Sequence, residues 1–372
     1  MTDAPEVDYG HASAQPRMAA GAGDRSVHCM STRIAINGFG RIGRGFVRAA
    51  VESGADLEIV AVNDVADAGT LAHLLDYDSI YGRFPGAVRA EDGILHAGEL
   101  RMRVFTERDP EELPWDDLEV DVVIESTGRF RTHAAAARHM TAGASKVILS
   151  APAKGPTPAD ANIVLGVNDH LYDPEQHHII TNASCTTNCL APVAGVLHGT
   201  VGIRHGVMTT IHAYTADQNL LDAPHKDLRR ARAAGLNLVP TSTGAAEALG
   251  LVIPELAGRL HGYAVRVPVA TGSIVDLTIE TECPTSVEEV NAAFAERADR
   301  GPLAGILAYS EAPIVSSDIV KSPYSAIFDA PLTSVIDDTQ VKVVAWYDNE
   351  WGYSNRLVEL AARVLVEVPA SL

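Results

Sequence analysis

Cysteine is scarce in this sequence. Four cysteines in 372 residues do not make a disulfide framework. We therefore expect a protein of the reducing cytoplasm. In such a chain an unusual cysteine is more often catalytic than structural.

Positive charge and long apolar runs are lacking as well. The formal net charge is −19 and no run of five or more basic residues occurs, which argues against a nucleic-acid partner. The longest apolar runs, such as “IVAV”, are only as long as a strand, so no membrane span is expected. No cluster of cysteine and histidine accompanies the cysteines of “NASCTTNC”, and we predict no metal site.

Residues 1–31 lack apolar periodicity and are rich in Ala, Gly, Asp and Pro. No basic start with a following apolar stretch indicates a signal peptide, and the acidic residues argue against a transit peptide. We expect a disordered N-terminal extension. The alternative hypothesis is that translation starts at Met30 and that the extension is a gene-prediction artefact.

A glycine turn follows the first strand-like stretch. “GFGRIG” places Gly38, Gly40 and Gly43 in the G-x-G-x-x-G spacing, between a strand and a helix. Such a turn lets the backbone approach a pyrophosphate at a helix N-terminus. Asp64 ends the next strand about 20 residues later, where a carboxylate binds the ribose of NAD and repels the 2′-phosphate of NADP. The pattern predicts an NAD site; a tight turn with a helix-capping Asp is the simpler alternative.

The pattern of apolar residues changes near Cys185. Over residues 32–184 strand-like and helical stretches alternate, which is typical of a parallel, doubly wound sheet. Over residues 185–348 long alternating runs such as “GSIVDLTIETE” predict an antiparallel sheet with helices on one face. We expect an α/β Rossmann dinucleotide-binding domain followed by an α+β catalytic domain with a large, mostly antiparallel sheet. Residues 349–372 are expected to form a final helix.

Cys185 and Cys189 both lie in “NASCTTNC”. Cys185 follows a strand and begins a helix, and a helix N-terminus lowers the pKa of a thiol. Its spacing to Cys189 is not the C-x-x-C of redox pairs. A nucleophile needs a base, and His212 in “VMTTIHAYT” is the candidate if it lies beside Cys185. On spacing alone, a catalytic thiol and a structural helix with buried cysteines fit these residues equally well.

Seven motifs occur in order along the chain: “INGFGRIGR”, “ASCTTNCLAP”, “HAYTADQ”, “PHKDLRRARAA”, “PTSTGAAEA”, “RVPVATGSIVDL” and “WYDNEWGYS”. Over residues 32–370 they make the chain resemble the phosphorylating, NAD-dependent glyceraldehyde-3-phosphate dehydrogenases of bacterial type. The resemblance implies glycolytic oxidation of D-glyceraldehyde 3-phosphate to 1,3-bisphosphoglycerate. It implies that Cys185 forms a hemithioacetal and then a thioester, and that His212 activates this thiol and acts as acid and base.

Two phosphate-binding sites are implied by the same resemblance. The substrate phosphate is expected at Thr215, Asp217 and Arg266, with Asp217 orienting Arg266. Inorganic phosphate is expected where hydroxyls, amides and a guanidinium are available, at Ser184, Thr186, Thr243, Gly244 and Arg230. Without the resemblance, Arg230 is an ordinary solvated arginine.

For the cofactor, the resemblance adds residues along the length of NAD: Arg41 and Ile42 at the pyrophosphate, Thr127 and Gly128 near the adenosine or ribose, Ser150 and Asn349 at the nicotinamide, and Tyr353 nearby. The final helix, residues 349–372, is implied to return to the first domain. Residues 213–238 correspond to an S-shaped loop at a subunit interface, which implies a homotetramer.

Some residues depart from the family pattern. Glu247 stands where a lysine is common, either at an exposed position or where it weakens phosphate binding. Val269, Ala270 and Ala223 also differ. These departures leave open an inhibitor-resistant second copy of the enzyme.

Two further functions are disfavoured. An erythrose-4-phosphate dehydrogenase departs from “HAYT” and “TSTGAA”, and both stretches are intact here. A non-catalytic binding protein on the same fold does not explain why Cys185, His212, Asp64 and Asn349 are all present.

Overall fold

The structure is a computed structural model that describes residues 31–157 and 159–365. The predicted disordered extension therefore lies outside the described residues, apart from Ser31. The last part of the predicted final helix, residues 366–372, lies outside them too.

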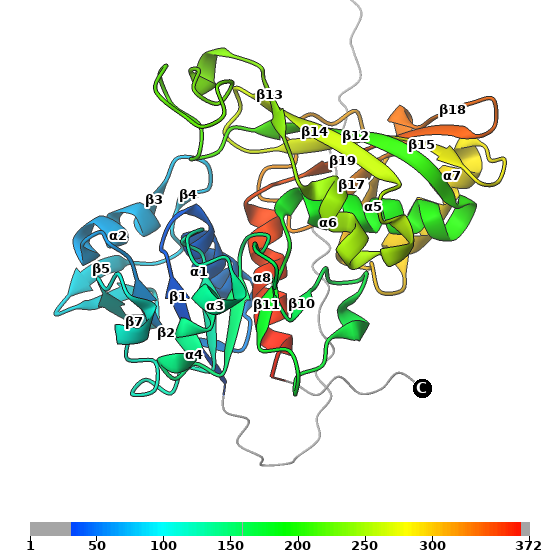
Figure 1. Ribbon diagram of the computed structural model, residues 1–372. Coiled ribbons are helices and arrows are strands. Elements are labelled where there is room, and N and C mark those ends of the chain that lie inside the picture. The colour runs from blue at the N-terminus through cyan, green and yellow to red at the C-terminus, as the bar shows by residue number, and fades with distance from the viewer. Residues whose placement is uncertain (1–30, 158, 366–372) are drawn as a thin grey trace, which may run out of the picture. The chain divides into compact units, whose positions relative to one another are not determined.

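A nine-stranded sheet is formed by the first half of the chain, in the order β10-β11-β9-β8-β1-β2-β7-β6-β5 (Figure 1). All neighbours from β10 to β7 are parallel, and β7, β6 and β5 form antiparallel hairpins at one edge. Its strands are β1 (Thr32–Asn37), β2 (Leu57–Asn63), β5 (Val88–Glu91), β6 (Ile94–Ala97), β7 (Leu100–Phe105), β8 (Val122–Glu125), β9 (Lys146–Leu149), β10 (Ala161–Asn162) and β11 (Ile179–Thr181). The helices that accompany it are α1 (Arg41–Ser53), α2 (Ala68–Asp76), α3 (His133–Ala136) and α4 (Arg138–Thr141), and β3 (Tyr77–Asp78) pairs separately with β4 (Gly82–Arg83).

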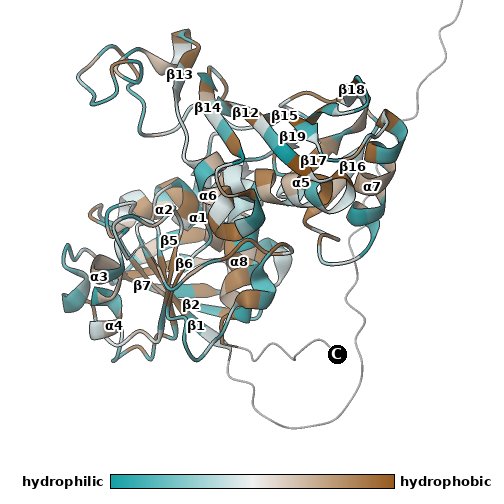
Figure 2. Cartoon of the chain, turned by 45° about the vertical axis from the view of Figure 1, so that its right-hand side comes forward, coloured by the Kyte–Doolittle hydropathy of each residue, from teal (hydrophilic) through white to brown (hydrophobic). Residues whose placement is uncertain are grey.

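Three central strands of this sheet end level with one another. In the strand register, Asn37 at the end of β1 pairs with Asn63 on β2 and with Glu125 on β8. The carboxyl ends of parallel strands form the edge at which α/β sheets bind ligands. Figure 2 shows hydrophobic residues along these strands. The polar strand ends therefore stand out at the edge of a buried apolar sheet.

An eight-stranded sheet is formed by the second half, in the order β13-β14-β12-β15-β19-β17-β16, with β18 paired to β19. Its neighbours are antiparallel except for β12 with β14 and β16 with β17. The strands are β12 (Ile203–Ala213), β13 (Val239–Ser242), β14 (Leu260–Val267), β15 (Ser273–Thr281), β16 (Leu307–Ser310), β17 (Ala326–Asp329), β18 (Ser334–Ile336) and β19 (Gln340–Tyr347). Helices α5 (Cys185–Val201), α6 (Ala245–Val252) and α7 (Val287–Asp299) pack against it. The predicted fold class, a Rossmann-like parallel sheet followed by a mostly antiparallel one, is confirmed.

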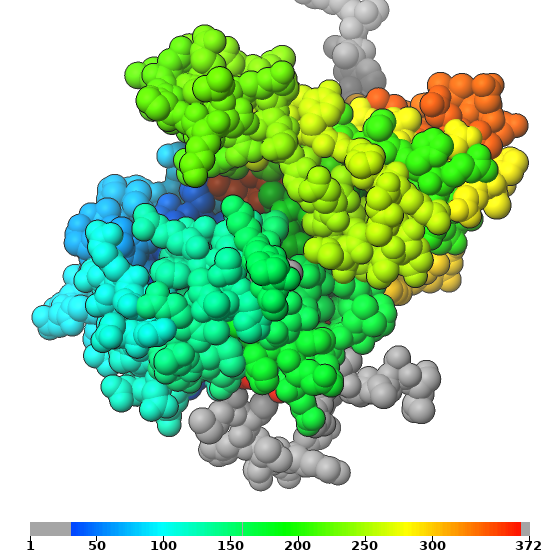
Figure 3. All heavy atoms as spheres, in the orientation of Figure 1, coloured from blue at the N-terminus to red at the C-terminus, as the bar shows by residue number. Residues whose placement is uncertain are grey.

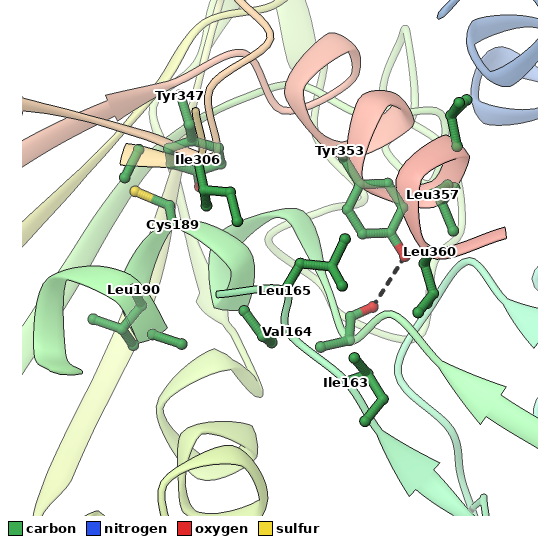
Figure 4. Close-up of a cluster of buried hydrophobic side chains, with 14 of the residues drawn as sticks. Ile163, Val164, Leu165, Cys189, Leu190, Ile306, Tyr347, Tyr353, Leu357 and Leu360 are labelled. Carbon is green, nitrogen blue, oxygen red and sulfur yellow. Dashed lines mark hydrogen bonds between the residues drawn. The ribbon is translucent and has the colours of Figure 1, made fainter. Parts of the chain in front are cut away.

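Helix α8 (Trp351–Arg363) ends the described chain and packs against α1 of the first sheet. The helices touch closely, because a Cβ atom at Gly45 would lie 2.5 Å from the hydroxyl of Ser354. Leu357 and Leu360 of α8 belong to the buried cluster in Figure 4, which also contains Cys189 of α5. The final helix thus returns to the first sheet, while the exact domain boundaries, 32–184 and 185–348, stay a prediction.

Candidate active site

The glycine turn between β1 and α1 borders a pocket of about 240 Å³. Gly38 has φ of +94°, and a Cβ there would lie 2.6 Å from the amide nitrogen of Thr127. A Cβ at Gly43 would overlap the carbonyl oxygen of Gly38. Oδ2 of Asp64 accepts a hydrogen bond from the amide of Phe39 at 2.7 Å, which ties the second strand to the turn. The pocket is lined by Asn37, Gly38, Gly40, Asn63, Asp64, Val65, Glu107, Arg108, Ser126, Thr127, Arg129 and Phe130.

Gly40 indicates that a dinucleotide fits this turn. It is the N-cap of α1, yet no side chain caps the helix, and a Cβ at Gly40 would meet nothing within 4 Å. No side chain therefore caps the first amides of α1, and the space beside Gly40 is not filled by the chain, as an anion site at a helix N-terminus requires. Thr127 and Gly128 follow β8 at the same edge of the sheet, and Gly128 is exposed.

Arg41 is the first residue of α1 at the glycine turn, and its place at the pyrophosphate stays a prediction. Its guanidinium pairs with Asp78 and with Glu350, the latter through Nε at 3.0 Å. The backbone of Arg41 and that of the half-buried Ile42 are therefore the groups that remain available to a pyrophosphate at the glycine turn. Arg41 and Glu350 also line a second pocket with Tyr214 and Thr215, and Figure 3 shows the hollow between these segments.

Two of the predicted nicotinamide residues, Asn349 and Tyr353, make hydrogen bonds to distant parts of the chain. Oδ1 of Asn349 accepts a hydrogen bond from Ser273 at 2.8 Å. The hydroxyl of Tyr353 donates to the carbonyl of Ala183 at 3.2 Å (Figure 4), two residues before Cys185. Ala183 has φ of +52°, so this bond holds a strained backbone at the start of α5. Ser150 is half-buried just after β9.

Cys185 and His212 lie side by side. Cys185 is the first residue of α5, whose N-cap Ser184 accepts a hydrogen bond from the amide of Thr187 at 3.1 Å. The sulfur of Cys185 is 3.5 Å from Nε2 of His212, near the end of β12. The ring of Tyr347 meets the His212 ring edge-on, with 5.9 Å between the centroids. The sequence left open whether His212 lies beside Cys185, and this contact shows that it does.

Burial dominates the electrostatics of this pair. It raises the pKa of the Cys185 thiol, while the charge of Arg266 and the amide of Thr186 act in the opposite direction. Burial and the charge of Arg266 lower the pKa of His212 to about 3. The expected lowering of the thiol pKa by the helix N-terminus is therefore outweighed as long as the imidazole is neutral. Nδ1 of His212 lies 2.7 Å from the carbonyl oxygen of Ala213, which can only accept, and 2.9 Å from Nη1 of Arg266, which can only donate. In the tautomer that donates from Nδ1 to Ala213, Nε2 is free to take a proton from sulfur.

Arg266 joins this pair to the predicted substrate-phosphate site. Its Nη1 donates to Thr215 Oγ1 at 3.0 Å and to the carbonyl of Ala213 at 3.1 Å. Asp217, however, pairs with Arg230 and accepts a hydrogen bond from Thr215. Asp217 therefore contacts the arginine of the other predicted site directly and is linked to Arg266 through Thr215, so the orienting of Arg266 by Asp217 stays a prediction.

The predicted inorganic-phosphate site is assembled in part. Arg230 is not a solvated arginine: its Nε donates to Thr241 at 2.9 Å and its side chain is 19% exposed. Thr243 and Gly244 precede α6, and Gly244 is an N-cap without a side-chain cap. Thr186 requires a correction. Its hydroxyl is hydrogen-bonded to Tyr347 at 2.9 Å and the residue is 4% exposed, so its side chain faces the core instead of a phosphate.

Two other expectations concern neighbouring residues. Glu247 is exposed in the first turn of α6, as the simpler interpretation expected. Cys189 is fully buried one turn after Cys185. Over the described residues, no group of three or more Cys, His, Asp or Glu is placed to hold a metal. In the same part of the chain no helix has the length and apolar character needed to cross a bilayer.

Comparison with known proteins agrees with this site. The model of the glyceraldehyde 3-phosphate dehydrogenase NAD binding domain matches residues 32–133, and that of the C-terminal domain of the same enzyme matches residues 184–349. The chain belongs to the glyceraldehyde-3-phosphate dehydrogenase family. It is 62% identical over 335 residues to glyceraldehyde-3-phosphate dehydrogenase 1 of Streptomyces avermitilis, covering 90% of this chain and 99% of the relative. It is 61% identical over 341 residues to the glyceraldehyde-3-phosphate dehydrogenase of Mycobacterium tuberculosis, with the same shares covered.

Membership in this dehydrogenase family confirms the resemblance seen in the motifs and the NAD-binding character of the first half. The structure adds residues that the sequence interpretation missed. The hydroxyl of Tyr347 is hydrogen-bonded to the hydroxyls of Thr186 and Thr210, each at 2.9 Å, and its ring packs on His212. Ser273 orients Asn349. Tyr347 and Ser273 lie in strands whose alternating pattern predicts that they are buried. The pattern does not predict which side chains they contact.

Proposed function

We propose that this protein catalyses the NAD-dependent, phosphorylating oxidation of D-glyceraldehyde 3-phosphate to 1,3-bisphosphoglycerate in glycolysis. The observation that carries the proposal is the contact between Cys185 and His212 beside Arg266 and Thr215. A thiol nucleophile, its base and an anion-binding pair are the groups that an aldehyde with a phosphate requires.

The reaction begins with the thiol. His212 Nε2 takes the proton of Cys185, and the two opposite charges stabilise each other in the buried site. The sulfur then forms a bond to the aldehyde carbon, and the imidazolium returns its proton to the new alkoxide, which gives a hemithioacetal. His212 next removes the hydroxyl proton as the carbon is oxidised to a thioester.

NAD supplies the hydride acceptor for this oxidation. The glycine turn and Asp64 are suited to hold its pyrophosphate and adenosine ribose, and Asn349 its carboxamide. Because Oδ1 of Asn349 already accepts from Ser273, its Nδ2 is the atom that remains for the carboxamide oxygen.

Inorganic phosphate completes the reaction. One of its oxygens attacks the thioester carbon, the carbon–sulfur bond breaks, and the product leaves as an acyl phosphate while Cys185 is restored. Arg230, Ser184 and the amides of Thr243 and Gly244 are proposed to hold the attacking anion, and Arg266 and Thr215 the substrate phosphate. The thioester conserves the oxidation energy, which a serine ester would not do as well.

We also propose that the enzyme is a cytoplasmic homotetramer. Residues 213–238 expose several leucines that are more than two-thirds accessible: Leu220, Leu221, Leu228, Leu236 and Leu238. Apolar patches of this kind are typical of surfaces that bind another subunit. Light scattering after gel filtration should give four chains per particle, and a monomer would contradict this proposal.

The activity is tested by phosphate-dependent formation of NADH. Glyceraldehyde 3-phosphate should be used far more efficiently than erythrose 4-phosphate, and omission of phosphate should stop turnover. A preference for erythrose 4-phosphate would favour the alternative function. Absence of activity with both sugars would refute the proposal.

A further inference from the structure

A buried carboxylate, Glu125, lies beneath the pocket at the glycine turn. It ends β8 and is 3% exposed. Oε1 accepts from the amide of Thr127 at 2.9 Å and also from its hydroxyl. Oε2 accepts from Nδ2 of Asn37 at 2.6 Å and lies 3.1 Å from Nε2 of His139. Both oxygens are thus occupied by donors.

Among the described residues, no lysine or arginine forms an ion pair with Glu125. Its one partner there that could carry a positive charge is His139. Nδ1 of His139 lies 3.1 Å from the indole nitrogen of Trp115. An indole nitrogen can only donate, so Nδ1 must accept and the ring proton must be on Nε2. His139 is therefore a neutral donor. Glu125 is held by the dipoles of four neutral groups, an arrangement that tolerates little displacement because burying an unsatisfied charge is costly.

The donors that Glu125 fixes form the walls of the pocket. Thr127 and Asn37 line it directly. Oδ1 of Asn37 accepts from Nδ2 of Asn63 at 2.7 Å. The Asn63 side chain in turn makes two hydrogen bonds with the backbone of Glu107. Its Nδ2 donates to the carbonyl oxygen at 2.9 Å, and its Oδ1 accepts from the amide at 2.8 Å. The hydrogen bonds therefore run from Glu125 across β1 and β2 to the loop after β7, and Glu107 lines the opposite part of the same pocket.

We propose that Glu125 is a positioning residue for the adenosine half of the cofactor. It fixes Thr127 directly, and it fixes Glu107 through Asn37 and Asn63, so that both walls of the pocket are preorganised. This inference rests on the proposed NAD-dependent function. Glu125 acts through these neighbours and makes no contact with the reacting atoms at Cys185.

The test is Glu125→Gln in the full-length protein, probed with ADP, which carries the adenosine and the pyrophosphate of NAD without the nicotinamide and its ribose. The substitution keeps the shape of the side chain but places an NH₂ group against two of the four donors. Two hydrogen bonds to a charged group are thereby lost. Calorimetry should show ADP binding weakened about 10-fold. The KM for NAD should rise by the same factor, while kcat at saturating NAD and the KM for glyceraldehyde 3-phosphate stay within twofold of wild type.

Glu58→Gln is the matched control. Glu58 lies on β2 of the same sheet, is 54% exposed in its side chain and pairs with Arg33 at 2.6 Å. Glu58→Gln makes the same change of charge near the amino end of β2, away from the carboxyl ends that border the pocket, so ADP affinity should not change.

A folded Glu125→Gln protein with wild-type affinity for ADP overturns the inference, even if its melting temperature falls. If Glu125→Gln does not fold, His139→Asn removes one donor and leaves the carboxylate. It should weaken ADP binding about threefold, and unchanged binding would refute the proposal. Because ADP binding is measured without turnover, a wild-type protein inactive on the sugar phosphates would refute the proposed function separately.

Discussion

The sulfur of Cys185 lies 3.5 Å from Nε2 of His212, although the two residues are 27 positions apart in the chain. Helix α5 presents the thiol at its first residue, and β12, the next strand, brings the imidazole back to it. We propose that proton transfer within this contact creates the nucleophile.

Cys185→Ser should abolish phosphate-dependent NADH formation, by about 10³-fold or more, because a serine hydroxyl is a far weaker nucleophile next to a neutral imidazole. The change is nearly isosteric, so the melting temperature and NAD binding should be kept. Cys283→Ser is the control: this cysteine is exposed and should be dispensable. Appreciable activity of the Cys185→Ser protein would exclude the thioester mechanism.

His212→Asn should raise the pH at which Cys185 is alkylated by iodoacetamide. Burial raises the pKa of this thiol, and without the imidazole no neighbouring base accepts its proton. Thiolate formation then requires a higher pH, so the midpoint of the rate profile moves upward. The kcat should fall about 10²- to 10⁴-fold. An unchanged alkylation profile would mean that His212 does not act on the thiol.

Arg230→Lys should raise the KM for both inorganic phosphate and glyceraldehyde 3-phosphate, each by about 5- to 10-fold. A lysine cannot keep the contacts of the guanidinium with Asp217 and Thr241 together. Asp217 in turn holds Thr215 of the substrate-phosphate site. Steady-state kinetics with each substrate varied provides the measurement, and exposed Arg229→Lys is the control. An effect on the KM for inorganic phosphate alone would show that the two sites are independent.

Asp64→Asn should lower the preference for NAD over NADP by about 10-fold. The charge that repels a 2′-phosphate is lost, while an amide oxygen is kept for the amide of Phe39. Asp64→Ala loses both, so NAD affinity itself should fall further. The measurement is the ratio of kcat/KM with NAD to kcat/KM with NADP, in each variant. A ratio unchanged in both variants would mean that Asp64 does not select the cofactor.

Gly40→Ala and Gly43→Ala should separate binding from stability. A methyl group at Gly40 meets no atom of the chain, so this variant should melt like wild type but bind NAD more weakly. At Gly43 it overlaps the carbonyl of Gly38, so the backbone must shift, at a cost of about 1–3 kcal/mol. Thermal melting with and without NAD distinguishes the two. Equal melting temperatures would contradict the close packing of the turn.

Much of the site could be predicted because its signals are local. A strand, a glycine turn and a helix follow one another around Gly38, and a strand and a helix flank Cys185. Backbone preferences and apolar spacing over about ten residues determine such elements. The role of Arg230 could not be predicted in this way, since its partner Asp217 lies 13 positions away across a loop with few structural signals.

The sequence by itself determined the two kinds of sheet, the glycine turn, the start of α5 at Cys185 and the residue types of the site. Only the tertiary structure decided which groups touch: that His212 faces Cys185, that Thr186 faces Tyr347 and the core, and that Glu125 is enclosed by four donors. The physical reason is that strand register and helix packing bring distant segments together, and burial then sets the pKa of each group. Neither is encoded in the spacing of a few neighbouring residues.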